Sequence, residues 1–147
     1  MSSPGAVLGL DLGTSRIGVA VSDPDRRLAV PIGTVHVGRP PGELKAIAAL
    51  VAEHGAILVV LGHPRSLSGA GGPAASHAEA FAQALRAVLT VPVELQDERM
   101  TTVEAERVLR EAGVTGRERR AVVDRTAAAL ILQAWLDAHR GPADATV

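Results

Sequence analysis

The order of its apolar segments limits what this chain can fold into more than any other feature. Residues with strand character come first, and from residue 43 onward strand and helix patterns alternate. The strand-like segments are residues 6–12, 17–21, 28–37, 57–61 and 91–95. The helical segments are residues 43–54 and 73–89 and two more that begin near Thr101 and Thr115. A meander that leads into β-α-β-α-β units predicts an α/β fold with a mixed five-stranded sheet and helices packed on its faces, and the pattern alone leaves several such topologies open.

The length and composition indicate one globular domain. The chain has 147 residues, of which 47% are hydrophobic and 21% charged. We expect a single domain over residues 1–147, with frayed tails at 1–5 and 141–147. Phe81 and Trp135 are the only aromatic residues, so we do not expect an aromatic platform for stacked bases. The formal net charge of −1 means that any surface for nucleic acid must be local.

Two kinds of feature that the sequence lacks restrict the reactions the protein can catalyse and its location in the cell. The chain has no cysteine, which excludes disulfides, thiol nucleophiles and cysteine metal sites. The first residues lack the pattern of a signal peptide, and no apolar run approaches the roughly 20 residues that a membrane span needs. We therefore expect a cytoplasmic protein with no membrane partner.

Asp11 stands in an apolar segment, Val7-Leu8-Gly9-Leu10-Asp11-Leu12, which predicts an inner strand. A carboxylate buried there is costly unless a cation or hydrogen-bond donors compensate it. The alternative is an aspartate at a strand end that caps the turn at Gly13.

A charged residue at Asp124 is more unexpected than one at Asp11, because the last helix is apolar on almost every side and should be deeply buried. Helical spacing puts Asp124 on one face with Ala121, Ala128, Ile131 and Trp135. The alternative to a functional role is a buried ion pair with Arg120 or another arginine.

Asp97 and Glu98 follow directly after the strand-like segment 91–95. Alternation along a strand fails at its end, so it cannot choose between the two acids, and a solvated strand end is the alternative reading. Together with Asp11 and Asp124, one of them could complete a cluster of three carboxylates. Oxygen ligands without histidine or cysteine suit Mg²⁺ or Mn²⁺. Two such ions can promote hydrolysis of a phosphodiester, which predicts a nuclease.

Four segments resemble the motifs of the YqgF/RuvX family, in the same order. They are Gly9–Ala20 (GLDLGTSRIGVA), Gly62–Pro64 (GHP), Asp97–Thr102 (DERMTT) and Val123–Leu132 (VDRTAAALIL). The likeness extends from about Val7 to Leu136. In many members of the family the second motif continues with Asn and Asp-Gly, whereas here it continues as Arg65–Gly69 (RSLSG).

The resemblance implies an RNase H-like fold, in which three antiparallel strands of the mixed sheet are followed by parallel ones and helices cover both faces. It also implies a two-metal site of Mg²⁺ or Mn²⁺. It implies that Asp11, Glu98 and Asp124 are the metal-binding catalytic acids, and so selects Glu98 over Asp97. It also implies a nuclease that processes the 5′ end of pre-16S ribosomal RNA, or a Holliday junction resolvase.

Several polar residues near these motifs are candidates for contacts with structured RNA or a four-way DNA junction. The nucleic-acid-binding candidates are Arg16, Arg65, Ser66, Arg99, Thr101, Thr102 and Arg125. The alternatives are a solvated helix face for the arginines and an ordinary connector for residues 62–72. His63 is a further hypothesis, as a general acid.

Two other classes of function compete with the nuclease. An ATPase of the actin and hexokinase type would share the fold and an Asp-x-Gly-Thr loop, but 147 residues cannot supply its two large lobes. A non-catalytic binding module would have lost the chemistry, whereas all three acids are present. A homodimer would favour junction resolution, because a resolvase makes two symmetric cuts.

Overall fold

A computed structural model describes residues 5–13, 15–38, 42–64, 72–98 and 117–139, and for 117–126 it describes the helix but not the side chains. Five strands and three helices lie in this part of the chain. In chain order they are β1 Ala6–Leu12, β2 Arg16–Ser22, β3 Ala29–His36, α1 Gly42–His54, β4 Ala56–His63, α2 Pro73–Val88, β5 Val93–Asp97 and α4 Arg117–Ala138.

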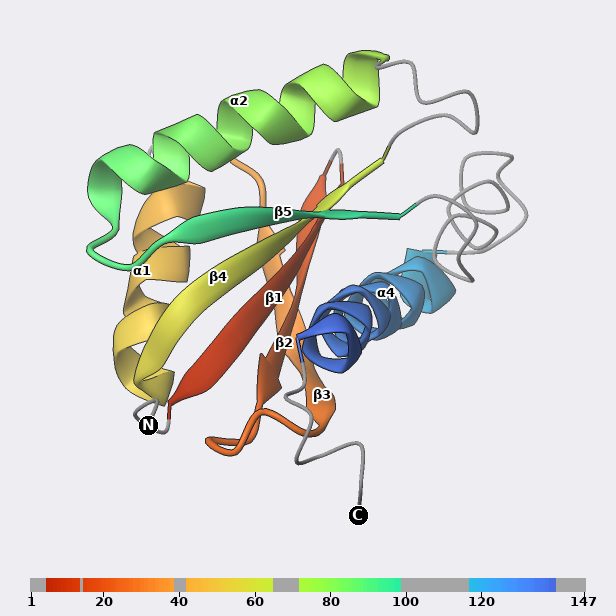
Figure 1. Ribbon diagram of the computed structural model, residues 1–147. Coiled ribbons are helices and arrows are strands. Elements are labelled where there is room, and N and C mark those ends of the chain that lie inside the picture. Colours follow the sequence, from red (N-terminus) through yellow and green to blue (C-terminus); the bar gives the residue numbers. More distant parts are fainter. Residues whose placement is uncertain (1–4, 14, 39–41, 65–71, 99–116, 140–147) are drawn as a thin grey trace.

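The strands form one mixed sheet in the order β3-β2-β1-β4-β5. β1 is antiparallel to β2, and β2 is antiparallel to β3. β4 is parallel to both β1 and β5. The predicted fold class is therefore confirmed, and β1 and β4 lie in the interior of the sheet (Figure 1).

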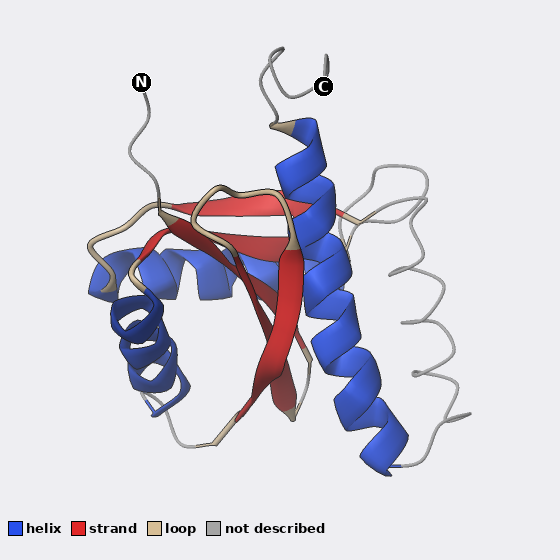
Figure 2. Ribbon diagram, turned by 90° about the horizontal axis from the view of Figure 1, so that it is seen from below, coloured by secondary structure: helices blue, strands red, loops and turns tan. Residues whose placement is uncertain are grey.

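Helices cover both faces of the sheet. α1 and α2 pack on one face, and α4 lies across the other, against β1, β2 and β3 (Figures 1 and 2). The amino-terminal part of α4 lies toward the end of the molecule where β4 and β5 finish (Figure 1). None of the helices in the described ranges carries an apolar stretch long enough to cross a membrane.

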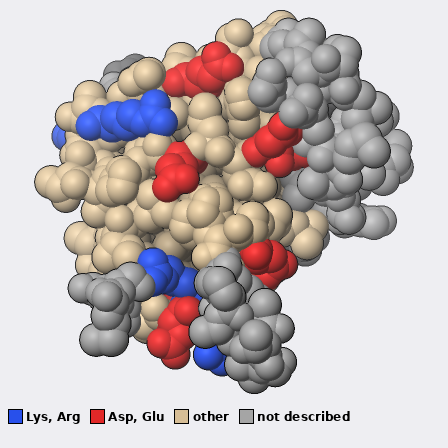
Figure 3. Space-filling model, viewed as in Figure 1, with Lys and Arg blue, Asp and Glu red and all other residues tan. Residues whose placement is uncertain are grey.

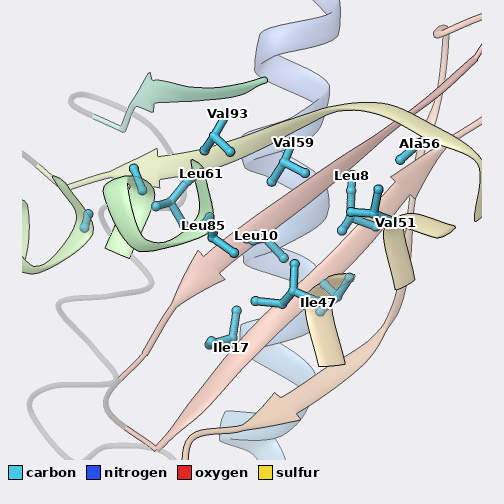
Figure 4. Packing of buried hydrophobic residues seen from close by; sticks show 13 residues of the cluster. Leu8, Leu10, Ile17, Ile47, Val51, Ala56, Val59, Leu61, Leu85 and Val93 are labelled. Carbon is cyan, nitrogen blue, oxygen red and sulfur yellow. The ribbon is translucent and has the colours of Figure 1, made fainter. Parts of the chain in front are cut away.

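Alternation along β1 divides the core into two layers. Leu8 and Leu10 belong to the layer beneath α1 and α2, which Figure 4 shows from close by. Val7 belongs to the layer beneath α4, and Gly9 faces the same helix. Because successive side chains of a strand point to opposite faces, Asp11 follows Val7 and Gly9 onto the α4 face.

Two predicted boundaries were wrong at one edge of the sheet. The strand predicted over 57–61 continues through Gly62 and His63, which had been assigned to a loop, and the strand predicted over 91–95 is β5, two residues later. The reason is mutual pairing, because Gly62 and His63 lie opposite Gln96 and Asp97 in the parallel ladder. Gly62 and Pro64 suggested a loop, but the hydrogen bonds between β4 and β5 keep residues 62 and 63 in the strand.

The last helix is buried on one side rather than all round. Ala128, Leu132 and Leu136 are buried, whereas Leu130 is 36% exposed and Asp137 lies at the surface. A single helix that covers one face of a sheet needs only one apolar stripe. The predicted helix that begins near Thr101 and the tail at 141–147 lie outside the described residues.

Candidate functional site

Asp11 is a buried carboxylate inside the sheet. It pairs with Gly18 across the ladder to β2, and its side chain is 0% exposed. The turn that follows is closed by the backbone, where the Gly13 N–H donates to the Arg16 carbonyl oxygen at 2.9 Å. The position of Asp11 within an inner strand agrees with the sequence prediction. Burial of a carboxylate at such a position carries a large desolvation cost that a nearby cation or donor must offset.

Glu98 is the second buried acid, with 3% exposure. Its backbone N–H donates to the His63 carbonyl oxygen at 3.2 Å, which extends the pairing of β4 and β5 by one residue. Asp97, the last residue of β5, is only half-buried. Burial therefore distinguishes the two acids that the sequence pattern alone left open.

The carboxylate of Glu98 lies over Gly62 of β4. Glu98 Oε2 is 2.5 Å, and Glu98 Cδ 3.2 Å, from the position that a Cβ of residue 62 would take. Ile131 Cδ1 of α4 lies 2.6 Å from the same point. The carboxylate is thus on the face of the sheet that α4 covers.

The register of β1 and β4 brings the two carboxylates to one place. Leu10 pairs with Leu61, so Asp11 and Gly62 are the next neighbours along two parallel strands. Such strands lie about 4.8 Å apart. Because Asp11 points to the α4 face and the Glu98 carboxylate lies over Gly62, the two acids share one face and one end of the sheet.

Asp124, the third predicted acid, lies in α4 one helical turn before Ala128. Ala128 is fully buried, and its carbonyl oxygen would lie 3.2 Å from a Cβ at Gly9. The side chain of Asp124 is outside the part of the chain that is described, and so is its suggested ion pair with Arg120. Among the described residues no group of three acids or histidines is assembled, and the structure brings together Asp11 and Glu98 alone.

Of the residues predicted to contact nucleic acid, Arg16 is the one whose side chain lies in the described part of the chain. Arg16 is the first residue of β2, half-buried, and by alternation it shares the α4 face with Gly18 and Ala20. Arg125 lies in α4, but its side chain is not described. The candidates that fall outside the described residues are Arg65, Ser66, Arg99, Thr101 and Thr102.

His63 has a partner that the sequence did not reveal. Its Nε2 lies 2.8 Å from Glu79 Oε2 of α2, and the His63 side chain is 13% exposed. The ring therefore contacts the helix layer opposite α4, on the other face of the sheet from Asp11 and the Glu98 carboxylate. This geometry argues against His63 as a general acid. No local pattern predicts the contact, since 16 residues separate the partners.

Charge on the visible surface is mixed. Acidic and basic side chains are interspersed over the described part of the face in Figure 3, without one continuous basic area there. This agrees with the formal net charge of −1.

Comparison with known proteins agrees with this architecture. The sequence model of RuvX, described as "Holliday junction resolvase", matches residues 5–138. A protein of Mycolicibacterium paratuberculosis is 51% identical over 137 residues, covering 92% of this chain and 82% of the relative. One of Mycobacterium tuberculosis is 52% identical over 134 residues, covering 90% and 79%. Both are named "Putative pre-16S rRNA nuclease".

A solved structure shows the same fold at low sequence identity. "T. thermophilus RuvC in complex with Holliday junction substrate" superposes with a TM-score of 0.51 at 17% identity, covering 93% of this chain and 96% of that one. The RNase H-like arrangement that the motifs implied is thereby confirmed. With a family match that spans residues 5–138 and relatives that are half identical, this chain belongs to the RuvX family.

Proposed function

We propose that this protein is a divalent-metal-dependent nuclease that hydrolyses phosphodiester bonds in structured nucleic acid. The observation that carries the proposal is the pair of buried carboxylates, Asp11 and Glu98, at the same end and on the same face of the sheet. The family and its relatives, described as a resolvase and as nucleases, support the same class of reaction.

The donor set suits a hard cation. Asp11 and Glu98 are 0% and 3% exposed, and two neighbouring carboxylates withdrawn from water repel each other unless positive charge compensates them. Oxygen ligands without sulfur or imidazole suit Mg²⁺ or Mn²⁺. A pair of such ions, when bound, would activate a water and stabilise the leaving oxygen of the phosphodiester. The absence of a side chain at Gly62 leaves room for the Glu98 carboxylate beside Asp11.

Asp124 is proposed as the third acid. α4 lies across the sheet face that carries the other two, and its amino-terminal part lies toward the end where β4 and β5 finish (Figure 1). Ala128 and Ile131, which follow Asp124 by four and seven residues, are both buried against the sheet. Helical spacing gives positions 124, 128 and 131 one common stripe, which supports a role for Asp124 in the same site.

In this proposal the protein's own side chains have separate tasks. Asp11, Glu98 and Asp124 hold the metal, and Arg16, at the start of the neighbouring strand, binds a phosphate of the substrate. Ile131 closes the side of the site toward α4, since its Cδ1 lies over Gly62 next to the Glu98 carboxylate. An apolar wall on that side keeps water away from the carboxylates and strengthens their hold on a cation.

We favour pre-16S ribosomal RNA as the substrate, because the relatives that are half identical are named "Putative pre-16S rRNA nuclease". The resemblance to the YqgF/RuvX family implies cleavage at the 5′ end of this RNA, and we propose the cytoplasm as the location. A four-way DNA junction is the second candidate, because the matching family is described as a junction resolvase. Junction cleavage needs two active sites related by two-fold symmetry, so it also needs a homodimer. Light scattering on the free protein and on its complex with a junction would measure that assembly.

A cleavage panel tests the function. The substrates are a precursor-rRNA fragment, a four-way DNA junction, duplex DNA and single strands, each with Mg²⁺, with Mn²⁺ and with a chelator. We expect cleavage of at least one structured substrate, lost with chelator and lowered at least about 100-fold by Asp11→Asn or Glu98→Gln, equivalent to about 2.7 kcal/mol in the barrier.

The matched control is Glu79→Gln. It makes the same chemical change as Glu98→Gln, at a side chain that pairs with His63 on the opposite face of the sheet. We expect it to cleave like the unmodified protein. Equal cleavage by Asp11→Asn and the unmodified protein would refute the proposed chemistry.

A further inference from the structure

We propose that Gly62 is a positioning residue. Because it has no side chain, the Glu98 carboxylate can lie directly over its Cα, and we call this space the seat of the carboxylate. The inference rests on the proposed function, because it takes that carboxylate to be a metal ligand, and it adds a residue that determines where the ligand stands. Gly62 itself touches neither metal nor substrate in this account.

The backbone does not explain why residue 62 is a glycine. Gly62 lies in the regular part of β4, opposite Gln96 in the parallel ladder, and its φ is outside the left-handed region. A glycine inside a strand weakens that strand, and it marks a place where another group approaches closely. The space above its Cα is therefore the feature that requires explanation.

Two groups occupy that space. Glu98 Oε2 lies 2.5 Å and Ile131 Cδ1 2.6 Å from the position of an added Cβ. Both are the far ends of flexible side chains, so a methyl group at residue 62 would push them aside rather than break the fold. The Glu98 backbone would stay in place, since its N–H is bound to the His63 carbonyl oxygen. An added methyl group would therefore displace the Glu98 carboxylate as well as the end of the Ile131 side chain, and the carboxylate would move away from β4, the strand next to Asp11.

Gly9 provides an internal comparison. It lies on the neighbouring strand β1 and faces the same helix, but the atoms above it are Leu132 Cβ at 2.6 Å and the Ala128 carbonyl oxygen at 3.2 Å. These atoms belong to the body of α4 and cannot swing away. Gly9 therefore permits the helix to approach the sheet, whereas Gly62 permits a carboxylate to lie on it. A methyl group added at Gly9 should therefore lower the stability of the fold, whereas one added at Gly62 should lower the affinity for metal.

The test measures Mn²⁺ affinity by calorimetry on the full chain, with urea unfolding of the same samples. For Gly62→Ala we expect affinity to fall about 10- to 100-fold, as is typical when the support of a metal ligand is disturbed. The unfolding midpoint should change little. Ile131→Val alone removes Cδ1, and its Mn²⁺ affinity is the reference for the double variant.

The double variant Gly62→Ala with Ile131→Val separates the two neighbours of the glycine. It relieves the contact with Ile131 Cδ1 and leaves the contact with the carboxylate, so Mn²⁺ affinity should stay low. Recovery of affinity in the double variant would mean that Gly62 makes room for α4, and the inference would be wrong. Unchanged affinity in Gly62→Ala would overturn it as well.

A different experimental result would refute the proposed function itself. If the unmodified protein neither binds Mn²⁺ nor cleaves any substrate of the panel, the metal-dependent chemistry itself is refuted. If the unmodified protein does both and Gly62→Ala equals it in both, only the seat for Glu98 is refuted.

Discussion

Gly9 of β1 and Leu132 of α4 lie so close that a Cβ at residue 9 would stand 2.6 Å from the Leu132 Cβ. The Ala128 carbonyl oxygen would lie 3.2 Å from the same point. α4 therefore rests directly on the backbone of β1, and this close approach fixes the height of the helix above the sheet. Since Asp124 lies one turn before Ala128, the same contact sets how near that residue comes to the face that carries Asp11.

Gly9→Ala should destabilise the fold. The added methyl group meets a Cβ and a backbone oxygen of α4, which cannot move without a shift of the helix, and overpacking of this kind costs about 1–3 kcal/mol. Urea unfolding followed by circular dichroism measures the change. Gly38→Ala is the control, because a Cβ there meets nothing within 4 Å. Equal stability of the two variants would contradict the close packing of β1 and α4.

Gln133→Ala should loosen the attachment of α4 to the β2–β3 turn. Gln133 Oε1 accepts from the Ala29 N–H at 2.9 Å, and its Nε2 donates to the Arg27 carbonyl oxygen at 3.0 Å. The substitution leaves the part-buried Ala29 N–H without this acceptor, which costs about 1–3 kcal/mol of unfolding free energy. Gln83→Ala, at an exposed position of α2, is the matched control and should change stability little. A loss no greater than that of Gln83→Ala would refute the role of Gln133.

Asp23 should make the stability of the protein depend on acid pH. The Leu28 N–H donates to its carboxylate at 2.8 Å and holds the pKa of Asp23 below its usual value of 3.8, with help from the Arg27 N–H at 2.9 Å. A lowered pKa in the folded state contributes stability above pH 3.8, and this contribution is lost as the pH falls through the folded pKa.

Asp23→Asn tests that dependence by urea unfolding between pH 7 and pH 2. The stability difference from the unmodified protein should be largest above pH 3.8 and should shrink below it. Asp25→Asn, an exposed change in the same turn, provides the comparison. A difference for Asp23→Asn that stays constant over the whole range would contradict the linkage.

Divalent metal should stabilise the protein through Asp11 and Glu98. A ligand that binds only the folded state raises the free energy of unfolding by about 2.7 kcal/mol at 100 times its dissociation constant. Thermal unfolding with and without Mg²⁺ or Mn²⁺ should therefore show a higher midpoint with metal for the unmodified protein and for Glu79→Gln. Asp11→Asn and Glu98→Gln should lose the response. A response that survives in both of these variants would place the bound metal elsewhere.

Much of the fold could be predicted from the order of patterns along the chain. The bounds of β1 agree with the apolar run over residues 6–12, and the short turns after it predict the antiparallel pairing with β2. The carboxyl end of β4 was missed, because Gly62 and Pro64 suggest a loop while pairing with β5 keeps Gly62 and His63 extended. That pairing joins segments more than 30 residues apart, which no local pattern contains.

Part of the candidate site could be predicted from the sequence, at a residue whose type is unusual for its neighbours. Asp11 is a charge in an apolar strand, and its full burial agrees with that anomaly. The pattern could not choose between Asp97 and Glu98, because the difference in their burial arises from packing against β4 and α4, which are distant in sequence. The seat over Gly62 could not be predicted at all, since it is made where β4, Glu98 and Ile131 of α4 meet.

The position of bound Mn²⁺ in a crystal of this protein tests the central claim most directly, because the anomalous scattering of manganese locates the ion independently of any activity. We predict anomalous density at the carboxyl end of β1, with oxygens of Asp11, Glu98 and Asp124 as ligands at roughly 2.1–2.3 Å, close to the distances usual for hard divalent cations. Density bound away from Asp11 and Glu98, or none beside them at millimolar Mn²⁺, would contradict the account.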